Sequence, residues 1–148
     1  MLKVMLVGPV SVGKTSLINA LQNTKTAVKK TQAICFVGDA IDTPGEYAQI
    51  PRFYSALLVT SLAADVVLIL CDVAKPAATL PPNFARTFAK PVVGVITKID
   101  LQPAGSDKAE NCLRQAGVTP PFFPVSTLSG AGICDLYKFL VERRCNYE

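Results

Sequence analysis

Eight consecutive residues near the start of the chain have the types and spacing of a phosphate-binding loop. Residues 8–15 read G-P-V-S-V-G-K-T and match the pattern G-x-x-x-x-G-K-[ST] at every fixed position. In such a loop the backbone N–H groups point inward at the phosphates, and glycine leaves room for that approach. We expect Lys14 to reach the β- and γ-phosphate oxygens, and Thr15 to offer its hydroxyl to Mg²⁺. The pattern predicts a nucleoside triphosphate site. Its expected contacting residues are Gly8, Pro9, Val10, Ser11, Val12, Gly13, Lys14, Thr15 and Ser16.

A second motif, D-T-P-G at residues 42–45, follows an apolar run. It matches the D-x-x-G element of GTP-binding proteins, in which the aspartate holds Mg²⁺ through water and the glycine N–H senses the γ-phosphate. The same string is also a good β-turn. The phosphate loop upstream favours a metal role for Asp42 and a nucleotide contact for Gly45, because a Mg²⁺-nucleotide site needs a carboxylate on a neighbouring strand. Thr31, in a polar loop, is the candidate for a further Mg²⁺ ligand, and a loop residue facing water is the alternative.

A third motif, T-K-I-D at residues 97–100, resembles the [NT]-K-x-D element that binds guanine. The Asp100 carboxylate can accept from both the ring N–H and the exocyclic amino group of guanine, and adenine lacks the second donor. We expect Thr97 to lie at the same site and the Lys98 stem to lie along the base. A solvated loop or an adenine-binding ATPase remains the alternative. Ser126 and Thr127 follow the last expected strand, where related proteins contact the base through their backbone.

These motifs need strands and helices to hold them together. Apolar runs alternate with helical patterns, which predicts an α/β fold of three layers: a mostly parallel sheet with one antiparallel edge strand and helices on both faces. We expect one domain over residues 1–148. The expected strands are residues 2–7, 32–37, 40–42, 66–71, 91–97 and 122–125. The expected helices are a first one from Ser16, then residues 52–64, a short one that starts at the proline pair 81–82, and residues 107–116 and 132–143. Each motif falls at the carboxyl end of a strand, where open α/β sheets bind ligands.

Composition excludes several classes of function. Half of the residues are hydrophobic and 18% are charged, which favours a sheet buried on both faces over disorder. The net charge is +4 without a long basic run, so we expect no nucleic-acid partner. The five cysteines are scattered and the chain has no histidine, which disfavours a disulfide framework, a zinc site and histidine catalysis. The longest uncharged apolar run, residues 66–71, is too short to cross a bilayer, so we expect a cytoplasmic protein with no membrane partner.

Taken together, the motifs look like a small Ras-like GTPase, and three longer strings narrow the resemblance. K-T-Q-A at residues 30–33, D-T-P-G-E-Y at 42–47 and Y-S-A-L-L at 54–58 resemble the EutP/PduV family of ethanolamine- and propanediol-utilisation proteins. The resemblance implies that Thr31 lies in switch I and that residues 42–47 form switch II. It also implies a bacterial cytoplasmic nucleotide-binding protein with a microcompartment shell or enzyme partner. Members of the family have been described as GTPase-like and linked to ATP-dependent acetate phosphorylation.

One residue departs from the Ras-like pattern. Ras-like proteins carry a glutamine after the D-x-x-G glycine to orient the attacking water, and this chain has Glu46. A carboxylate can accept a proton from water, but its charge beside a triphosphate is unfavourable. The leading hypothesis is therefore a protein that binds GTP and GDP with Mg²⁺ and hydrolyses GTP slowly, with Lys14 and Glu46 as catalytic residues. The alternative is an acetate kinase that uses ATP. A structural shell protein with a vestigial site is a third hypothesis, which the intact Lys14, Thr15 and Asp42 disfavour.

Overall fold

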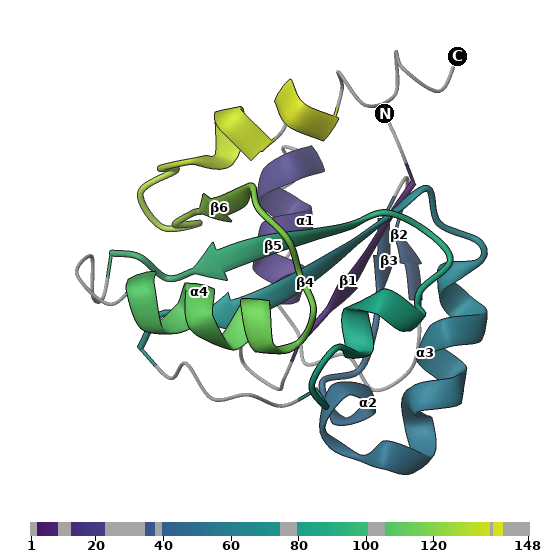
Figure 1. Ribbon diagram of the computed structural model, residues 1–148. Helices are drawn as coiled ribbons and strands as arrows, with labels where there is room; N and C mark the ends of the chain where they lie inside the picture. The colour runs from purple at the N-terminus through teal and green to yellow at the C-terminus, as the bar shows by residue number, and fades with distance from the viewer. Residues whose placement is uncertain are drawn as a thin grey trace.

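The computed structural model describes residues 3–8, 13–22, 35–37, 40–74, 80–100, 106–136 and 138–140. Within these residues, six strands form one sheet in the order β2-β3-β1-β4-β5-β6 (Figure 1). The strands are β1 (Val4–Val7), β2 (Cys35–Val37), β3 (Ala40–Asp42), β4 (Val66–Asp72), β5 (Val92–Thr97) and β6 (Phe122–Pro124).

Strand pairing brings the carboxyl ends of the parallel strands together along one edge of the sheet, the edge that runs across the strands. β1 pairs in parallel with β3 and β4, and β5 pairs in parallel with β4 and β6. β2 pairs antiparallel with β3 and is an outermost strand of the sheet. Leu6 of β1 is in register with Asp42 of β3, and Asp72 of β4 with Thr97 of β5. The carboxyl ends of these strands therefore share the edge toward which the β4 and β5 arrows point in Figure 1.

Helices cover both faces of this sheet, which confirms the predicted α/β fold class. The helical segments are α1 (Lys14–Gln22), α2 (Glu46–Gln49), the 3₁₀ helix η1 (Pro51–Phe53), α3 (Tyr54–Ser61), the 3₁₀ helix η2 (Phe84–Thr87) and α4 (Ser106–Gln115). Residues 133–136 and 138–140 are also helical. None of the helices in the described part of the chain is long and apolar enough to cross a membrane.

The apolar core is divided by the sheet into two clusters of buried side chains. Along β1, Met5 and Val7 pack with α3 and α4, whereas Val4 and Leu6 pack with α1 and the last helical residues. This alternation follows from the two-residue period of a strand. All seven residues of β4 are buried, as expected for a central parallel strand covered on both faces. The continuous apolar run that the sequence shows at residues 66–71 therefore has a structural reason.

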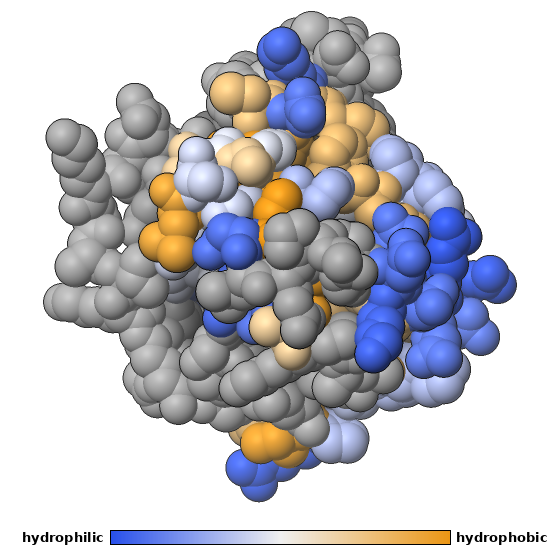
Figure 2. Space-filling model, turned by 90° about the vertical axis from the view of Figure 1, so that its left-hand side faces the viewer, coloured by the Kyte–Doolittle hydropathy of each residue, from blue (hydrophilic) through white to orange (hydrophobic). Residues whose placement is uncertain are grey.

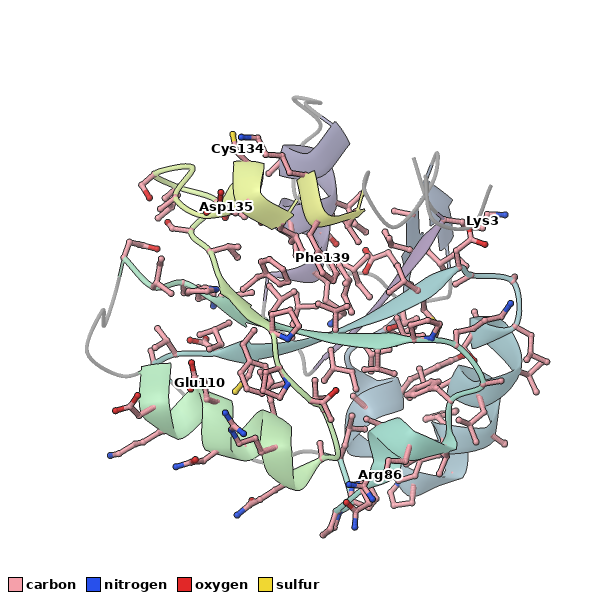
Figure 3. The ribbon with its side chains drawn as sticks, turned by 45° about the horizontal axis from the view of Figure 1, so that its top comes forward. Lys3, Arg86, Glu110, Cys134, Asp135 and Phe139 are labelled. Atoms are coloured by element: carbon pink, nitrogen blue, oxygen red, sulfur yellow. The ribbon has the colours of Figure 1, made fainter. Side chains whose placement is uncertain are left out.

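The last helical residues close one face of the sheet. Leu136 and Leu140 are fully buried there. Figure 3 shows Phe139 directed from this segment toward the sheet, where its ring lies 4.9 Å from that of Phe123 in β6. The predicted helix at residues 132–143 is thus observed in its first part, and residues 137 and 141–143 lie outside the described residues.

The segment after β3 differs from the sequence prediction. A helix was expected at residues 52–64, but the chain forms α2 at residue 46, then η1, and α3 ends at Ser61. Pro51 begins η1 because its missing N–H and restricted φ suit the first position of a helix. The backbone N–H of Tyr47 donates to Pro44 O at 3.0 Å, and this turn starts α2 directly after the D-x-x-G motif.

Candidate functional site

The predicted phosphate loop connects β1 to α1. Gly13 has a φ of +103°, which side chains with a Cβ rarely adopt, although a Cβ there would meet no atom within 4 Å. The requirement for glycine is therefore conformational. The Gly13 carbonyl accepts from Leu17 N at 2.9 Å, so α1 starts at the end of the loop. Residues 9–12 lie outside the described residues.

Lys14 extends from the first turn of α1 back to Gly8, at the end of β1. Its Nζ donates to the carbonyl oxygen of Gly8 at 2.8 Å, and its exposed fraction is 7%. A buried cation beside the positive end of a helix dipole is unfavourable unless oxygen atoms surround it. A phosphate group would supply such oxygens, so the position of the ammonium fits an anion-binding role.

The side chains predicted to bind Mg²⁺ meet although they are far apart in the sequence. Thr15 Oγ1 donates to Asp42 Oδ2 at 2.6 Å, and Asp42 is 3% exposed. The register of β1 with β3 brings the two together, and Thr43 Oγ1 donates to Leu6 O at 2.7 Å beside them. A hydroxyl and a carboxylate are the hard oxygen donors that Mg²⁺ prefers, so these residues fit the metal. Thr31 lies outside the described residues.

The D-x-x-G motif ends at the start of α2. Gly45 is buried, and its carbonyl accepts from Ala48 N at 3.2 Å. Glu46 is the first residue of α2, and the position of its side chain is outside the description. The aromatic ring of Tyr47 stacks on Phe53 at 4.6 Å, and the Arg52 guanidinium lies over the same ring at 4.8 Å. Packing of aromatic rings thus holds α2 against η1.

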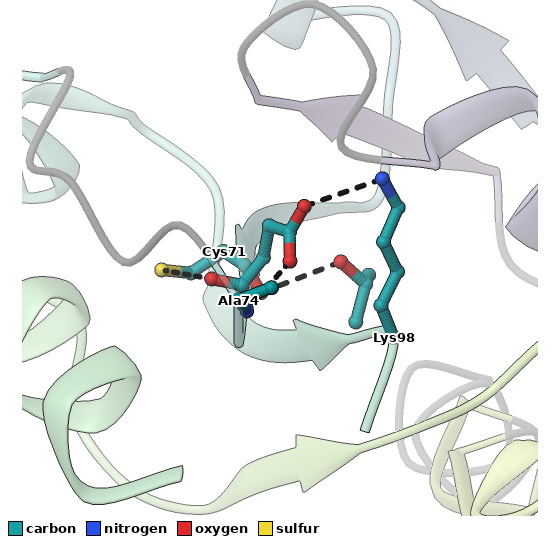
Figure 4. A network of polar contacts seen from close by, with 5 residues as sticks. Cys71, Ala74 and Lys98 are labelled. Atoms are coloured by element: carbon teal, nitrogen blue, oxygen red, sulfur yellow. Dashed lines mark hydrogen bonds and ion pairs between the residues drawn. The ribbon is translucent and has the colours of Figure 1, made fainter. Parts of the chain in front are cut away.

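The T-K-x-D motif follows β5 and is tied to the end of β4. Thr97 Oγ1 donates to Cys71 O at 3.4 Å, and Lys98 Nζ lies 3.2 Å from Asp72 Oδ2 (Figure 4). Lys98 has a φ of 61°, in the left-handed region. Beyond it, Asp100 Oδ1 accepts a hydrogen bond from Ser126 Oγ at 2.7 Å. The predicted base-binding carboxylate is therefore held by a residue that the sequence pattern also singled out.

Ser126 is fixed by the turn that follows β6. Its side chain is fully buried, its N–H donates to Ala131 O at 2.9 Å, and its Oγ accepts from Ser129 N at 3.2 Å. Gly132 closes this turn with a φ of +76°, and a Cβ there would overlap the carbonyl oxygen of Pro124. Thr127 lies in the same turn and is exposed. The turn presents the Ser126 hydroxyl to Asp100 in one orientation.

Two groups of polar residues thus lie along one edge of the sheet. The phosphate and metal candidates follow β1 and β3, and the base candidates follow β5 and β6, with β4 between the two groups. Adjacent strands are about 4.8 Å apart, so the ends of β1 and β5 are about 10 Å apart, as the phosphates and base of one nucleotide require. Figure 2 views the molecule from this edge and shows hydrophilic side chains gathered on its right, the side on which α4 lies.

Two residues at this edge were not singled out in the sequence. Asp72 pairs with Lys98, and Thr43 anchors the end of β3 to β1. Thr43 occupies a variable position of the D-x-x-G motif, so the pattern gave it no role of its own. Asp72 directly follows the apolar run at residues 66–71, but it belongs to no spaced pattern.

Cys71 lies beside the T-K-x-D motif but is not suited to nucleophilic chemistry. Burial, with smaller effects from Cys112 and Asp72, raises the pKa of its thiol from 9.0 to about 12. The thiol therefore stays protonated at neutral pH, and only the thiolate is an effective nucleophile. Cys71, Cys112 and Cys134 are all free thiols.

Comparison with known proteins finds a matching family profile and similar sequences. The sequence profile of the family described as "Ethanolamine utilisation - propanediol utilisation" matches residues 1–142. Propanediol utilization protein PduV of Citrobacter freundii is 37% identical over 141 residues, 95% of this chain and 93% of that protein. A protein of Escherichia coli K12 named "Probable acetate kinase EutP" is 34% identical over 145 residues, 96% of this chain and 91% of that protein.

A solved structure shares the fold. Aquifex aeolicus Era Y63A, bound to GDP and AlF4⁻, superposes with a TM-score of 0.68 at 24% identity, over 95% of this chain and 56% of that chain. The α/β fold is therefore shared with that protein. With the profile spanning nearly the whole chain, the resemblance noted from its motifs is confirmed: the protein belongs to the PduV-EutP family of ethanolamine and propanediol utilisation proteins.

Proposed function

We propose that residues 1–148 form a single domain that binds GTP and GDP with Mg²⁺ and hydrolyses GTP slowly, in ethanolamine or propanediol utilisation. One observation carries the proposal: the phosphate candidates and Asp100 lie at the same edge of one sheet, two strands apart. A nucleotide lying along this edge would meet Lys14, Thr15 and Asp42 with its phosphates and Asp100 with its base. The family profile supports the assignment to these pathways.

Selectivity for guanine is the expected consequence of the carboxylate of Asp100. Guanine presents two donors, its ring N–H and its exocyclic amino group, to one carboxylate, whereas adenine presents a different set. The hydrogen bond from Ser126 to Oδ1 restrains the carboxylate before the base arrives, which lowers the entropic cost of binding. Binding of a base that leaves the Asp100 carboxylate without a hydrogen-bond donor is less favourable by about 1 to 3 kcal/mol, which lowers the affinity roughly 5- to 150-fold. Thr97, Lys98 and Thr127 would complete the surroundings of the base.

Phosphate chemistry would be assisted by residues of the loop and the neighbouring strand. Mg²⁺, when bound, neutralises charge on the β- and γ-phosphate oxygens. Thr15 Oγ1 and Asp42 Oδ2 are already 2.6 Å apart, so both side chains would need little rearrangement to hold the metal. Lys14 would exchange the Gly8 carbonyl for phosphate oxygens. Gly45, whose carbonyl lies in the first turn of α2, would place its N–H toward the γ-phosphate.

Slow hydrolysis is expected because of the residue that follows Gly45. Glu46 stands where Ras-like proteins have a glutamine, and its negative charge beside a triphosphate is unfavourable because the two anions repel. Unaided turnover with the glutamine in place is on the order of 10⁻⁴ per second. We expect turnover by the isolated protein at or below this rate, and acceleration by a partner.

The second candidate function is ATP-dependent phosphorylation of acetate. The relative from Escherichia coli named "Probable acetate kinase EutP" supports it. In this reaction a carboxylate oxygen of acetate would attack the γ-phosphorus of ATP, and ADP would leave as acetyl phosphate forms. The Asp100–Ser126 pair disfavours this candidate, since a guanine-binding carboxylate has no evident use in an ATP site.

Calorimetric titration of GTP, GDP and ATP with Mg²⁺ into the purified protein tests the choice of nucleotide. We expect both guanine nucleotides to bind more tightly than ATP, and equal or tighter binding of ATP would contradict the guanine assignment. Single-turnover release of phosphate from GTP and from ATP, each with and without acetate, tests the reaction. GTP turnover near one per second would contradict slow hydrolysis, and an acetate-dependent rate with ATP would favour the kinase.

Membership of the family supports a proposal about location and partners. We propose a cytoplasmic protein that contacts a microcompartment shell protein or an enclosed enzyme, and neither nucleic acid nor a membrane. Fluorescence microscopy of a tagged chain in bacteria that make ethanolamine or propanediol microcompartments tests this proposal. Foci that coincide with a labelled shell protein are the expected result, and diffuse signal in the presence of shells would contradict it.

A further inference from the structure

Asp72 is a buried carboxylate at the edge of the sheet that carries the candidate site. It is the last residue of β4, the strand between those that precede the phosphate loop and the T-K-x-D motif. Its exposed fraction is 8%. Burial of a carboxylate is unfavourable unless hydrogen bonds or an opposite charge compensate for lost water. The partners of Asp72 therefore show what this charge stabilises.

The two carboxylate oxygens connect two different segments. Oδ2 lies 3.2 Å from Lys98 Nζ, and Oδ1 accepts from the backbone N–H of Ala74 at 2.8 Å. Figure 4 marks both contacts with dashed lines and labels Lys98 and Ala74. One side chain thus links the chain that leaves β4 to the motif that leaves β5.

Lys98 occupies a backbone conformation that needs support. Its φ of 61° is uncommon for a residue with a Cβ, and such residues gather at functional sites where their surroundings hold them. On either side, Val73 N donates to Thr97 O at 3.1 Å and Ile99 N donates to Val125 O at 3.3 Å. The ion pair with Asp72 restrains the side chain of the same residue. Lys98 is thus restrained through both its backbone neighbours and its ammonium group.

We propose that Asp72 is a positioning residue for binding of the nucleotide base. Its ion pair sets the direction of the Lys98 side chain, whose apolar stem would cover one face of the base. Because Asp100 is two residues further along, the same restraint on Lys98 helps to orient the base-binding carboxylate. This inference rests on the proposed function, since it requires a base beside Asp100.

A double-mutant cycle tests whether Asp72 acts through Lys98. The variants are Asp72→Asn, Lys98→Met, which keeps the apolar stem, and the double variant, each titrated with Mg²⁺-GDP and Mg²⁺-ADP. We expect each single change to weaken GDP binding by about tenfold, a modest loss because the lysine is partly exposed. The double variant should bind GDP no more weakly than the single variant with the lower GDP affinity. Additive losses would mean that Asp72 acts independently of Lys98, and would overturn the inference.

Asp65→Asn is the matched control. It makes the same change at the other end of β4, where Asp65 Oδ2 accepts from Lys3 N at 2.9 Å, far from the candidate site. Its GDP affinity should equal that of the wild type. A tenfold loss in this control would show that any carboxylate flanking β4 affects binding, and would overturn the specific role of Asp72.

A measurement without nucleotide isolates the ion pair itself. Acetylation of Lys98 by acetic anhydride, followed by mass spectrometry, should be several-fold faster in Asp72→Asn, since the amine is no longer held by a carboxylate. An unchanged rate would overturn the inference. If Asp72→Asn does not fold, Asp72→Ser replaces it in both experiments, because the hydroxyl removes the charge facing Lys98 but can still accept from the Ala74 N–H.

The outcomes separate this inference from the proposed function. Wild-type preference for ADP would remove the guanine assignment, while coupling between positions 72 and 98 for the nucleotide that binds would still support Asp72. Tight GDP binding with additive variants would remove only the role of Asp72. Failure of the wild type to bind either nucleotide would overturn both.

Discussion

Replacement of Asp100 by asparagine should change the preferred base from guanine to xanthine. In the structure, Ser126 Oγ donates to Asp100 Oδ1 at 2.7 Å and accepts from Ser129 N at 3.2 Å. With its oxygen already accepting from a backbone N–H, the hydroxyl has its proton available for an acceptor at position 100. An asparagine would therefore turn its amide oxygen toward Ser126 and its NH₂ group toward the base. That group would meet the exocyclic amino group of guanine as a second donor, whereas the 2-oxo group of xanthine would accept from it.

The size of the effect follows from the hydrogen bonds exchanged. The variant loses a hydrogen bond between guanine and a charged acceptor, worth about 1.5 to 3 kcal/mol, and places two donors together. We expect GDP affinity to fall by roughly 10- to 150-fold and xanthosine diphosphate affinity to rise above that of the wild type. Calorimetric titration of both nucleotides into both proteins measures the change.

Ser126→Ala provides the control for the orientation argument. Without the hydroxyl, the amide introduced by Asp100→Asn is free to turn either way, so the double variant should discriminate less between the two nucleotides than Asp100→Asn alone. Unchanged base preference in Asp100→Asn would refute the reasoning, because Asp100 would then lie outside the base site. Equal discrimination with and without Ser126 would refute the role given to the hydroxyl.

Three further predictions concern the phosphates, the reaction and the core. Lys14→Ala should weaken Mg²⁺-GTP binding by about 100-fold while keeping a cooperative thermal transition, because the ammonium contacts a loop carbonyl rather than the apolar core; loss of that transition would make Lys14 structural. Glu46→Gln should raise single-turnover GTP hydrolysis by roughly tenfold, since an amide orients water without adding negative charge beside the triphosphate; an equal or slower rate would contradict this. Cys71 has a folded-state pKa of about 12, above its ordinary value of 9.0, so the unfolded chain loses the proton first and stability falls as pH rises through this window. Between pH 8 and pH 10, the free energy of unfolding measured with urea should therefore fall by about 1 kcal/mol more in the wild type than in Cys71→Ala. An equal fall in both proteins would contradict this prediction.

The sequence by itself determined the features that depend on neighbouring residues. The phosphate loop was identifiable because a positive φ at Gly13 and an ammonium at the start of a helix are requirements of one short segment. The buried β4 was identifiable because a strand covered on both faces must be apolar throughout. The alternation of such strands with helical patterns predicted the fold class for the same reason. The signals for the phosphate loop and for β4 are each contained within one short segment, and the alternation is the succession of such local patterns along the chain.

Only the tertiary structure decided which distant side chains meet. Thr15 contacts Asp42 across 27 positions, and Asp100 contacts Ser126 across 26. The pairing of Asp72 with Lys98 depends on the register of β4 with β5, and a shift of one residue would turn each side chain to the opposite face. Strand order and register arise from packing of the whole core, so no local pattern contains them. The contacts that would position a nucleotide are therefore a property of the assembled sheet, whereas the residue types needed to bind it are present in the motifs.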